Sequence, residues 1–105
     1  MNQPFADHDP VFTVGQVAQL LQVQPAFLRR LEAHELISPE RSDGNQRRYS
    51  QRDMADVRYI CGLVDEGLTL AGVRRVLALE AEVRALRKQL AAEKARRSAA
   101  PSAGT

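Results

Sequence analysis

Residues 41–49 read Arg-Ser-Asp-Gly-Asn-Gln-Arg-Arg-Tyr, and this stretch decides the fold. The dipeptides Asp-Gly and Gly-Asn are typical of turns, so the stretch predicts a hairpin that raises Arg47 and Arg48 off the surface, with Tyr49 at its base. Two guanidinium groups on a rigid loop suit the phosphates of a nucleic-acid backbone. We therefore expect a wing beside a pair of DNA-reading helices.

Two short helices are predicted before the hairpin. Thr13 and Gln16 have the spacing of a capping box, and apolar residues follow at helical spacing over 13–21. Pro25 occupies the expected first position of a second helix over 25–34. A three-residue turn between two such helices makes a helix-turn-helix unit, whose second helix normally enters the major groove.

The rest of the chain predicts a strand and two more helices. Pro39 favours an extended backbone, so 36–39 is predicted as the first strand of the wing. Ser50 is expected to cap a third helix that ends at Gly67, and Thr69 to cap a fourth. Apolar residues of the fourth helix alternate three and four positions apart, as in a coiled coil, and are candidates for dimerisation: Val76, Leu79, Val83, Leu86 and Leu90.

The predicted fold class is mainly α: a winged helix-turn-helix domain with a small β-hairpin wing, followed by a C-terminal coiled-coil helix. We expect a flexible tail over 1–10 and a DNA-binding domain over 11–68. The dimerisation helix is predicted over 69–97 and a disordered tail over 98–105.

Composition excludes several classes of function. The 105 residues, 44% of them hydrophobic, support one modest core. Fifteen Lys and Arg against 13 Asp and Glu make the chain only weakly basic, so any signal for DNA comes from the placement of the cations. No paired carboxylates, activated nucleophile or Gly-rich phosphate loop is present, which predicts that the protein is not an enzyme.

The single cysteine favours a reducing compartment, and the isolated histidines give no indication of a metal cofactor. Cys61 is the single cysteine and lies on the apolar stripe of the third helix, which predicts an inert, buried thiol. His8 and His34 are isolated from other ligands, so no metal or other cofactor is expected. No signal peptide or membrane span of roughly 18 apolar residues is recognisable, and we expect a cytoplasmic, nucleoid-associated protein.

The candidate DNA contacts lie where the first helix begins, on the second helix and on the hairpin: Thr13, Gln24, Ala26, Phe27, Arg29, Arg30, Arg47, Arg48 and Tyr49. The amide of Gln24 can form two hydrogen bonds with the edge of adenine, and the methyl group of Ala26 can contact a thymine methyl group. Arg29 and Arg30 point about 100 degrees apart on a helix and therefore have different tasks.

Most of these residues also have a simpler interpretation. Thr13 and Gln24 would serve only as helix caps, and Ala26 as a spacer. Phe27 would anchor the core and Tyr49 would pack the wing onto the third helix. The arginines of the hairpin would then be solvated. Glu32 is predicted to orient an arginine through a salt bridge, because a carboxylate facing phosphate would repel it.

The order of these parts resembles the MerR family of bacterial transcription regulators. The matching residues are Phe12-Thr13-Val14-Gly15-Gln16-Val17-Ala18, Leu28-Arg29 with Glu32, Gly-x-x-Arg-Arg-Tyr-Ser, and a Gly-Leu-Thr-Leu helix start. The similarity runs from about Val11 to Leu90 and, through residues 65–77, is greatest to the HspR heat-shock repressors. Most relatives carry Thr at the position of Phe27 and aromatic residues at those of Arg30 and Leu31, so the operator sequence cannot be transferred.

The resemblance implies a homodimer, joined through an antiparallel coiled coil and bound to an inverted repeat. It further implies repression of chaperone operons with the chaperone DnaK as co-repressor. The charge pattern leaves the orientation of the coil open, because Glu80 would meet Arg87 in an antiparallel pair and Glu82 would meet Arg87 in a parallel one. Alternatives are an activator that distorts promoter DNA, and a coiled-coil protein-interaction module that does not bind DNA.

Overall fold

The computed structural model describes residues 7–99 and divides into two compact units on either side of the Arg74–Arg75 bond. Its elements follow in the order β1 (Phe12–Thr13), α1 (Val14–Leu21), α2 (Pro25–Ala33), β2 (Glu40–Arg41), β3 (Arg47–Tyr49), α3 (Gln51–Asp65) and α4 (Leu70–Ala99). The fold is mainly helical with a small antiparallel sheet, which confirms the predicted class.

The helix starts are set by side-chain caps that the sequence predicted. Thr13 and Gln16 form a reciprocal capping box at the start of α1, and Ser50 and Asp53 form another at the start of α3. The Thr69 hydroxyl oxygen accepts a hydrogen bond from the Gly72 backbone N–H at 3.1 Å, before the first residue of α4. These bonds satisfy donors that have no partner within the helix.

The sheet differs from the prediction in the position of its strands. Its order is β1-β3-β2, and β3 pairs antiparallel with both neighbours. The predicted first wing strand over 36–39 is wrong, because the ladder begins only at Glu40. Proline has no backbone N–H to donate, so Pro39 precedes the ladder instead of joining it. The short strand β1 was not predicted.

The hairpin loop closes through its own backbone, which confirms the predicted turn. The Ser42 N–H donates to the Gln46 carbonyl at 2.7 Å, and the Asn45 N–H donates to the Ser42 carbonyl at 2.8 Å. Asn45 adopts a φ of 61°, a left-handed conformation that asparagine tolerates better than most residues. The chain therefore reverses over residues 42–46, and Arg47 already belongs to the returning strand.

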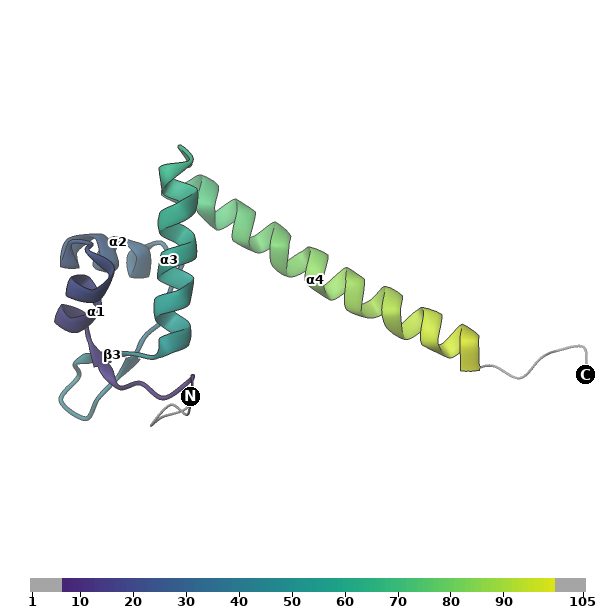
Figure 1. The fold of residues 1–105 in the computed structure, drawn as a ribbon, viewed down its shortest axis with the longest axis horizontal. Helices are drawn as coiled ribbons and strands as arrows, with labels where there is room; N and C mark the ends of the chain where they lie inside the picture. Colours follow the sequence, from purple (N-terminus) through teal and green to yellow (C-terminus); the bar gives the residue numbers. More distant parts are fainter. Residues whose placement is uncertain (1–6, 100–105) are drawn as a thin grey trace, which may run out of the picture. The chain divides into compact units, whose positions relative to one another are not determined.

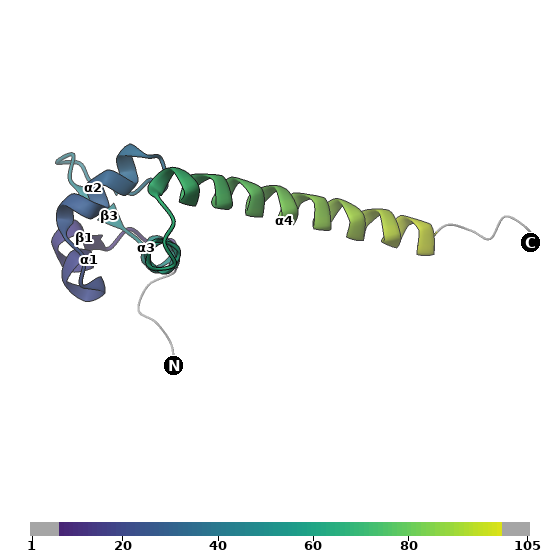
Figure 2. The same cartoon turned by 90° about the horizontal axis from the view of Figure 1, so that it is seen from above.

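The core of the first unit joins all four helices and the sheet. Figures 1 and 2 show α1 and α2 beside α3, with the strands near the first turn of α3. The buried hydrophobic side chains are Val17, Ala18, Leu28, Leu31, Ile37, Tyr49, Met54, Val57, Ile60, Leu70 and Val73. Because α1, α2 and β3 all contribute to this core, the helix-turn-helix and the wing belong to one packed unit.

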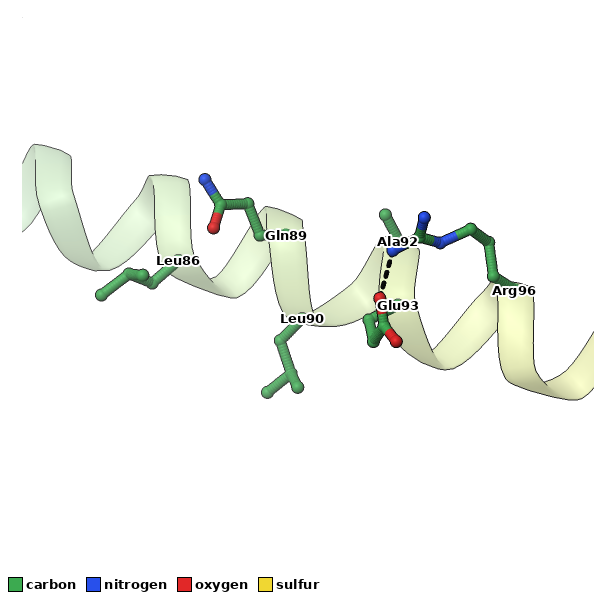
Figure 3. Close-up of a pocket in the computed structure, with 6 residues that line it drawn as sticks. All are labelled: Leu86, Gln89, Leu90, Ala92, Glu93 and Arg96. Atoms are coloured by element: carbon green, nitrogen blue, oxygen red, sulfur yellow. Dashed lines mark hydrogen bonds and ion pairs between the residues drawn. The ribbon is translucent and has the colours of Figure 1, made fainter.

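The second unit, described over residues 75–99, is helical throughout and leaves its apolar seam uncovered. Leu79, Val83, Leu86 and Leu90 are 44–57% exposed. Figure 3 shows Leu86 and Leu90 projecting from the same side of α4, with the Glu93–Arg96 ion pair one turn further on. Among residues 7–99, no helix combines the length and the hydrophobicity that a membrane span requires.

Candidate nucleic-acid interface

Helix α2 presents its arginines to solvent because its leucines face the core. Leu28 and Leu31 have no exposed surface, whereas Arg29 and Arg30 are exposed. Neither arginine forms an ion pair within residues 7–99. Both guanidinium groups are therefore available to a phosphate or to a base edge.

The first turn of α2 borders a hollow of about 500 Å³ between α2 and the end of α3. Residues from α3 line its other side: Cys61, Val64 and Asp65. From the predicted DNA contacts, Gln24, Ala26, Phe27 and Arg30 all line this hollow. Phe27 is only partly exposed, which favours its interpretation as an anchor between the helices. Arg29 does not line the hollow, so the two neighbouring arginines have different surroundings.

Two further candidates, Thr13 and Gln24, stand at the starts of α1 and α2 and differ in whether their side chains cap the helix. The Thr13 hydroxyl accepts from the Gln16 N–H at 3.1 Å, so its side chain is occupied by the capping box. Gln24 is the N-cap residue of α2, but its side chain makes no capping hydrogen bond. Ala26 is exposed beside it. Gln24 and Ala26 are thus exposed at the start of α2, where contacts with base edges are predicted.

The prediction that Arg47 is raised off the surface is wrong. Its Nε donates to Glu32 Oε2, and its side chain is only 30% exposed. Successive side chains of a strand point to opposite faces, so Arg47 shares the inward face of Tyr49. Glu32 on α2 lies on that side, which confirms the predicted salt bridge between Glu32 and an arginine.

Arg48 is the arginine of the hairpin that keeps its charge unpaired. Strand alternation turns it away from Arg47 and Tyr49, and its guanidinium donates only to the Arg47 carbonyl at 3.4 Å among the described contacts. Glu40 lies opposite Arg48 across the ladder, but no ion pair joins the two among the described residues, so the guanidinium has only this single long hydrogen bond to a neutral oxygen. Arg48 is half-buried, as Arg47 is, but of the two predicted wing contacts it is the one without an ion pair among the described residues.

Arg41 was not among the predicted contacts, although it opens the decisive stretch. Its Nη2 lies 3.0 Å from Glu32 Oε1, and its Nη1 donates to the Asn45 carbonyl at 3.4 Å. Glu32 therefore binds one arginine from each strand of the hairpin. The sequence did contain a signal for this arrangement, because Arg41 and Arg47 flank the turn and Glu32 lies on the preceding helix.

Tyr49 is removed from the set of DNA contacts by its burial. It has no exposed surface, and its hydroxyl lacks a hydrogen-bond partner within the described residues. Burial raises the pKa of the Tyr49 hydroxyl, and the negative charge of Glu32 raises it further. The packing interpretation of this residue is the one that its environment supports.

Replacement of Tyr49 by phenylalanine is expected to stabilise the fold by about 1 kcal/mol, because an unpaired buried hydroxyl costs free energy. Urea denaturation of both proteins measures the difference in the free energy of unfolding. DNA affinity should stay within about twofold, since the hydroxyl makes no contact with solvent in the fold. A large loss of DNA affinity without loss of stability would restore Tyr49 as a contact.

The same variant gives a prediction for pH. Below the pKa of an exposed tyrosine both states are neutral, so Tyr49 adds no pH dependence to stability. Above pH of about 10 the unfolded phenol ionises before the folded one, because the folded pKa is raised. The free energy of unfolding should therefore fall as the pH rises through this range. Tyr49→Phe should show a smaller fall in parallel denaturation curves.

Cys61 lies in the hollow beside α2 and is partly buried. Burial raises the pKa of its thiol, and the carboxylate of Asp65 raises it further. Because the thiolate is the reactive form, we expect the native protein to react several-fold more slowly with Ellman's reagent at pH 7.5 than the urea-unfolded chain. Asp65→Asn should accelerate the native reaction, and equal rates for native and unfolded protein would contradict this expectation.

No cluster of three or more potential metal ligands occurs among the His, Cys, Asp and Glu residues of 7–99. The candidate site consists of Arg29 and Arg30, on a helix whose leucines face the core, and of Arg48 on the hairpin. A helix-turn-helix with a β-hairpin wing and exposed arginines defines the class of winged helix-turn-helix DNA-binding proteins.

Comparison with known proteins identifies the family. The sequence pattern of the family described as MerR HTH family regulatory protein matches residues 12–80. The chain belongs to the MerR family of DNA-binding transcription regulators. It is 40% identical over 83 residues to the heat shock protein HspR of Streptomyces coelicolor, covering 78% of this chain and 55% of that protein.

Other relatives are named as transcription regulators. The HTH-type transcriptional regulator GlnR of Bacillus cereus is 38% identical over 71 residues, which cover 68% of this chain and 55% of GlnR. The chain thus spans about half the length of these curated relatives. The HTH-type transcriptional regulator MlrA of Escherichia coli is 31% identical over 67% of this chain and 29% of MlrA.

Solved structures share the fold at low sequence identity. A MerR-family transcriptional regulator from Bacillus cereus aligns with a TM-score of 0.60 and 21% identity, over 83% of this chain and 72% of that one. HiNmlR, a MerR-family regulator that lacks the sensor domain and was crystallised on promoter DNA, aligns with a TM-score of 0.58 and 16% identity, over 83% and 78%.

Proposed function

We propose that this regulator acts as a homodimer that binds an inverted-repeat operator. The supporting observation is the uncovered seam of α4, where Leu79, Val83, Leu86 and Leu90 stand in a row of alternating three- and four-residue spacing. Pairing with a second copy would bury these side chains and give two winged modules related by a two-fold axis. Two-fold symmetric readers match operators with two inverted half-sites.

We further propose that the protein represses genes of the heat-shock response. The similarity to HspR of Streptomyces coelicolor supports this assignment. The sequence resemblance to that subgroup carries the expectation that the chaperone DnaK acts as co-repressor. In this scheme, a fall in free DnaK during stress would release the operator, so that the sensing step lies outside this chain.

The experiment for the dimer and its operator is selection of sites from a random duplex library, followed by gel shifts on the recovered sequence. We expect an inverted repeat, a complex that contains two chains, and affinity that falls steeply with salt. Equal affinity for all duplexes would overturn the operator proposal. Addition of purified DnaK should then produce a complex that migrates more slowly in the gel and binds the operator more tightly. No change with DnaK would overturn the proposal that DnaK is the co-repressor.

The sign of regulation is tested separately by mapping bound sites on the chromosome. A repressor should occupy sites that exclude polymerase, and its deletion should raise transcription of the neighbouring genes. Occupancy inside an overlong promoter spacer, with loss of transcription after deletion, would instead establish the alternative of an activator that distorts promoter DNA.

A further inference from the structure

We propose that Glu32 is a positioning residue that fixes the wing relative to α2, and so sets the spacing at which Arg29 and Arg48 meet DNA. This inference rests on the proposed DNA-binding role of those two arginines. Glu32 with Arg41 and Arg47 is here called the Glu32 clamp. Its members come from three separate elements: α2, β2 and β3.

The Glu32 clamp uses both oxygens of one carboxylate on two different strands. Oε1 lies 3.0 Å from Arg41 Nη2, and Oε2 accepts from Arg47 Nε. The side chain of Glu32 is 22% exposed, so these bonds are partly shielded from water. Arg41 also reaches the loop, through the Asn45 carbonyl at 3.4 Å. Strands and loop are thereby all held to α2 through one side chain.

A second attachment holds the wing when the Glu32 clamp is absent. Strand β1 pairs with β3, with Phe12 opposite Tyr49 and Thr13 opposite Arg48. Tyr49 is also fully buried in the core. Loss of the carboxylate should therefore leave the sheet folded but free to change its angle to α2. The expected defect is one of geometry and not of folding.

The negative charge of Glu32 makes a positioning role distinguishable from a simple electrostatic effect. A carboxylate near DNA repels phosphate, so its simple removal should strengthen binding to any duplex. Removal of a positioning residue should instead weaken binding to the operator, where helix and wing must engage together, and spare random DNA. The two explanations thus predict changes of opposite sign on the operator.

The test measures Kd of Glu32→Gln at one salt concentration, on the operator selected by the wild-type protein and on a random duplex of equal length. We expect operator Kd to rise about tenfold and random-duplex Kd to stay equal or fall. Asp43→Asn is the matched control, because it removes the same charge from an exposed position on the hairpin loop. It should change Kd on both duplexes by the same factor.

Operator binding by Glu32→Gln that equals or exceeds that of the wild type would overturn the inference. Should Glu32→Gln fail to show a cooperative thermal transition, Glu32→Asp is measured instead, since it keeps the charge and shortens the reach. Glu32→Asp should also lose operator affinity, and wild-type affinity would reject the role. If the wild-type protein selects no sequence at all, the proposed operator binding fails first, and the inference falls with it.

Discussion

Leu86→Glu is expected to convert the protein from a dimer to a monomer at micromolar concentration. Leu86 is 57% exposed on the seam of α4, and each dimer would bury two copies. Losing two buried leucines costs roughly 3–6 kcal/mol at about 1.5–3 kcal/mol each. This corresponds to a dimer dissociation constant higher by about 10²–10⁴-fold. Sedimentation equilibrium measures this constant directly.

Ala85→Glu is the matched control for this change. It introduces the same residue one position earlier on α4, at an exposed position outside the seam. The control should stay dimeric and keep its operator affinity, whereas Leu86→Glu should lose operator binding in proportion to its loss of dimer. If Leu86→Glu remained dimeric, the seam would not be the interface. Circular dichroism checks that both variants retain their helix content.

Arg29→Ala with Arg48→Ala is expected to weaken operator binding by about 10³–10⁴-fold, because the proposed dimer loses four charged contacts at roughly 1–1.5 kcal/mol each. Both arginines lack an ion pair within residues 7–99, so their charge is available to phosphate. Each phosphate contact contributes about 0.9 to the slope of log K against log salt, so the loss of four contacts should make the slope shallower by roughly 3.6. Fluorescence anisotropy over a series of salt concentrations measures affinity and slope together.

The control for the double variant is Arg96→Ala with Arg97→Ala, which removes the same charge near the end of α4. There both guanidinium groups already pair with Glu93. Operator affinity should change little in the control. An unchanged salt slope in the Arg29 and Arg48 variant would contradict the assigned contacts. If the variant that carries Arg29→Ala and Arg48→Ala still bound its protein partners, the alternative of a coiled-coil interaction module would gain support.

Local signals were sufficient to predict the helices. The caps at Thr13, Ser50 and Thr69 bond to N–H groups only three residues away, so a short window of sequence contains both partners. The spacing of the seam is likewise readable from α4 alone. Its exposure in the structure agrees with the predicted seam, while the pairing of two chains stays a proposal.

Contacts between distant residues explain what the sequence did not predict. Whether Arg47 or Arg48 is free depends on Glu32, fifteen residues before Arg47, and on the strand face that each arginine occupies. Strand β1 has two residues and exists because β3 pairs with it, so no local periodicity marks it. The burial of Tyr49 follows from the same pairing, since β3 is the central strand.

The uncovered row of leucines on α4 has a consequence for gene dosage. If two chains must associate before an operator is filled, the supply of competent protein follows mass action. When the chain concentration is well below the dissociation constant of the dimer, halving the rate of synthesis would lower that supply about fourfold. A regulator built in this way would respond sharply to its own expression level.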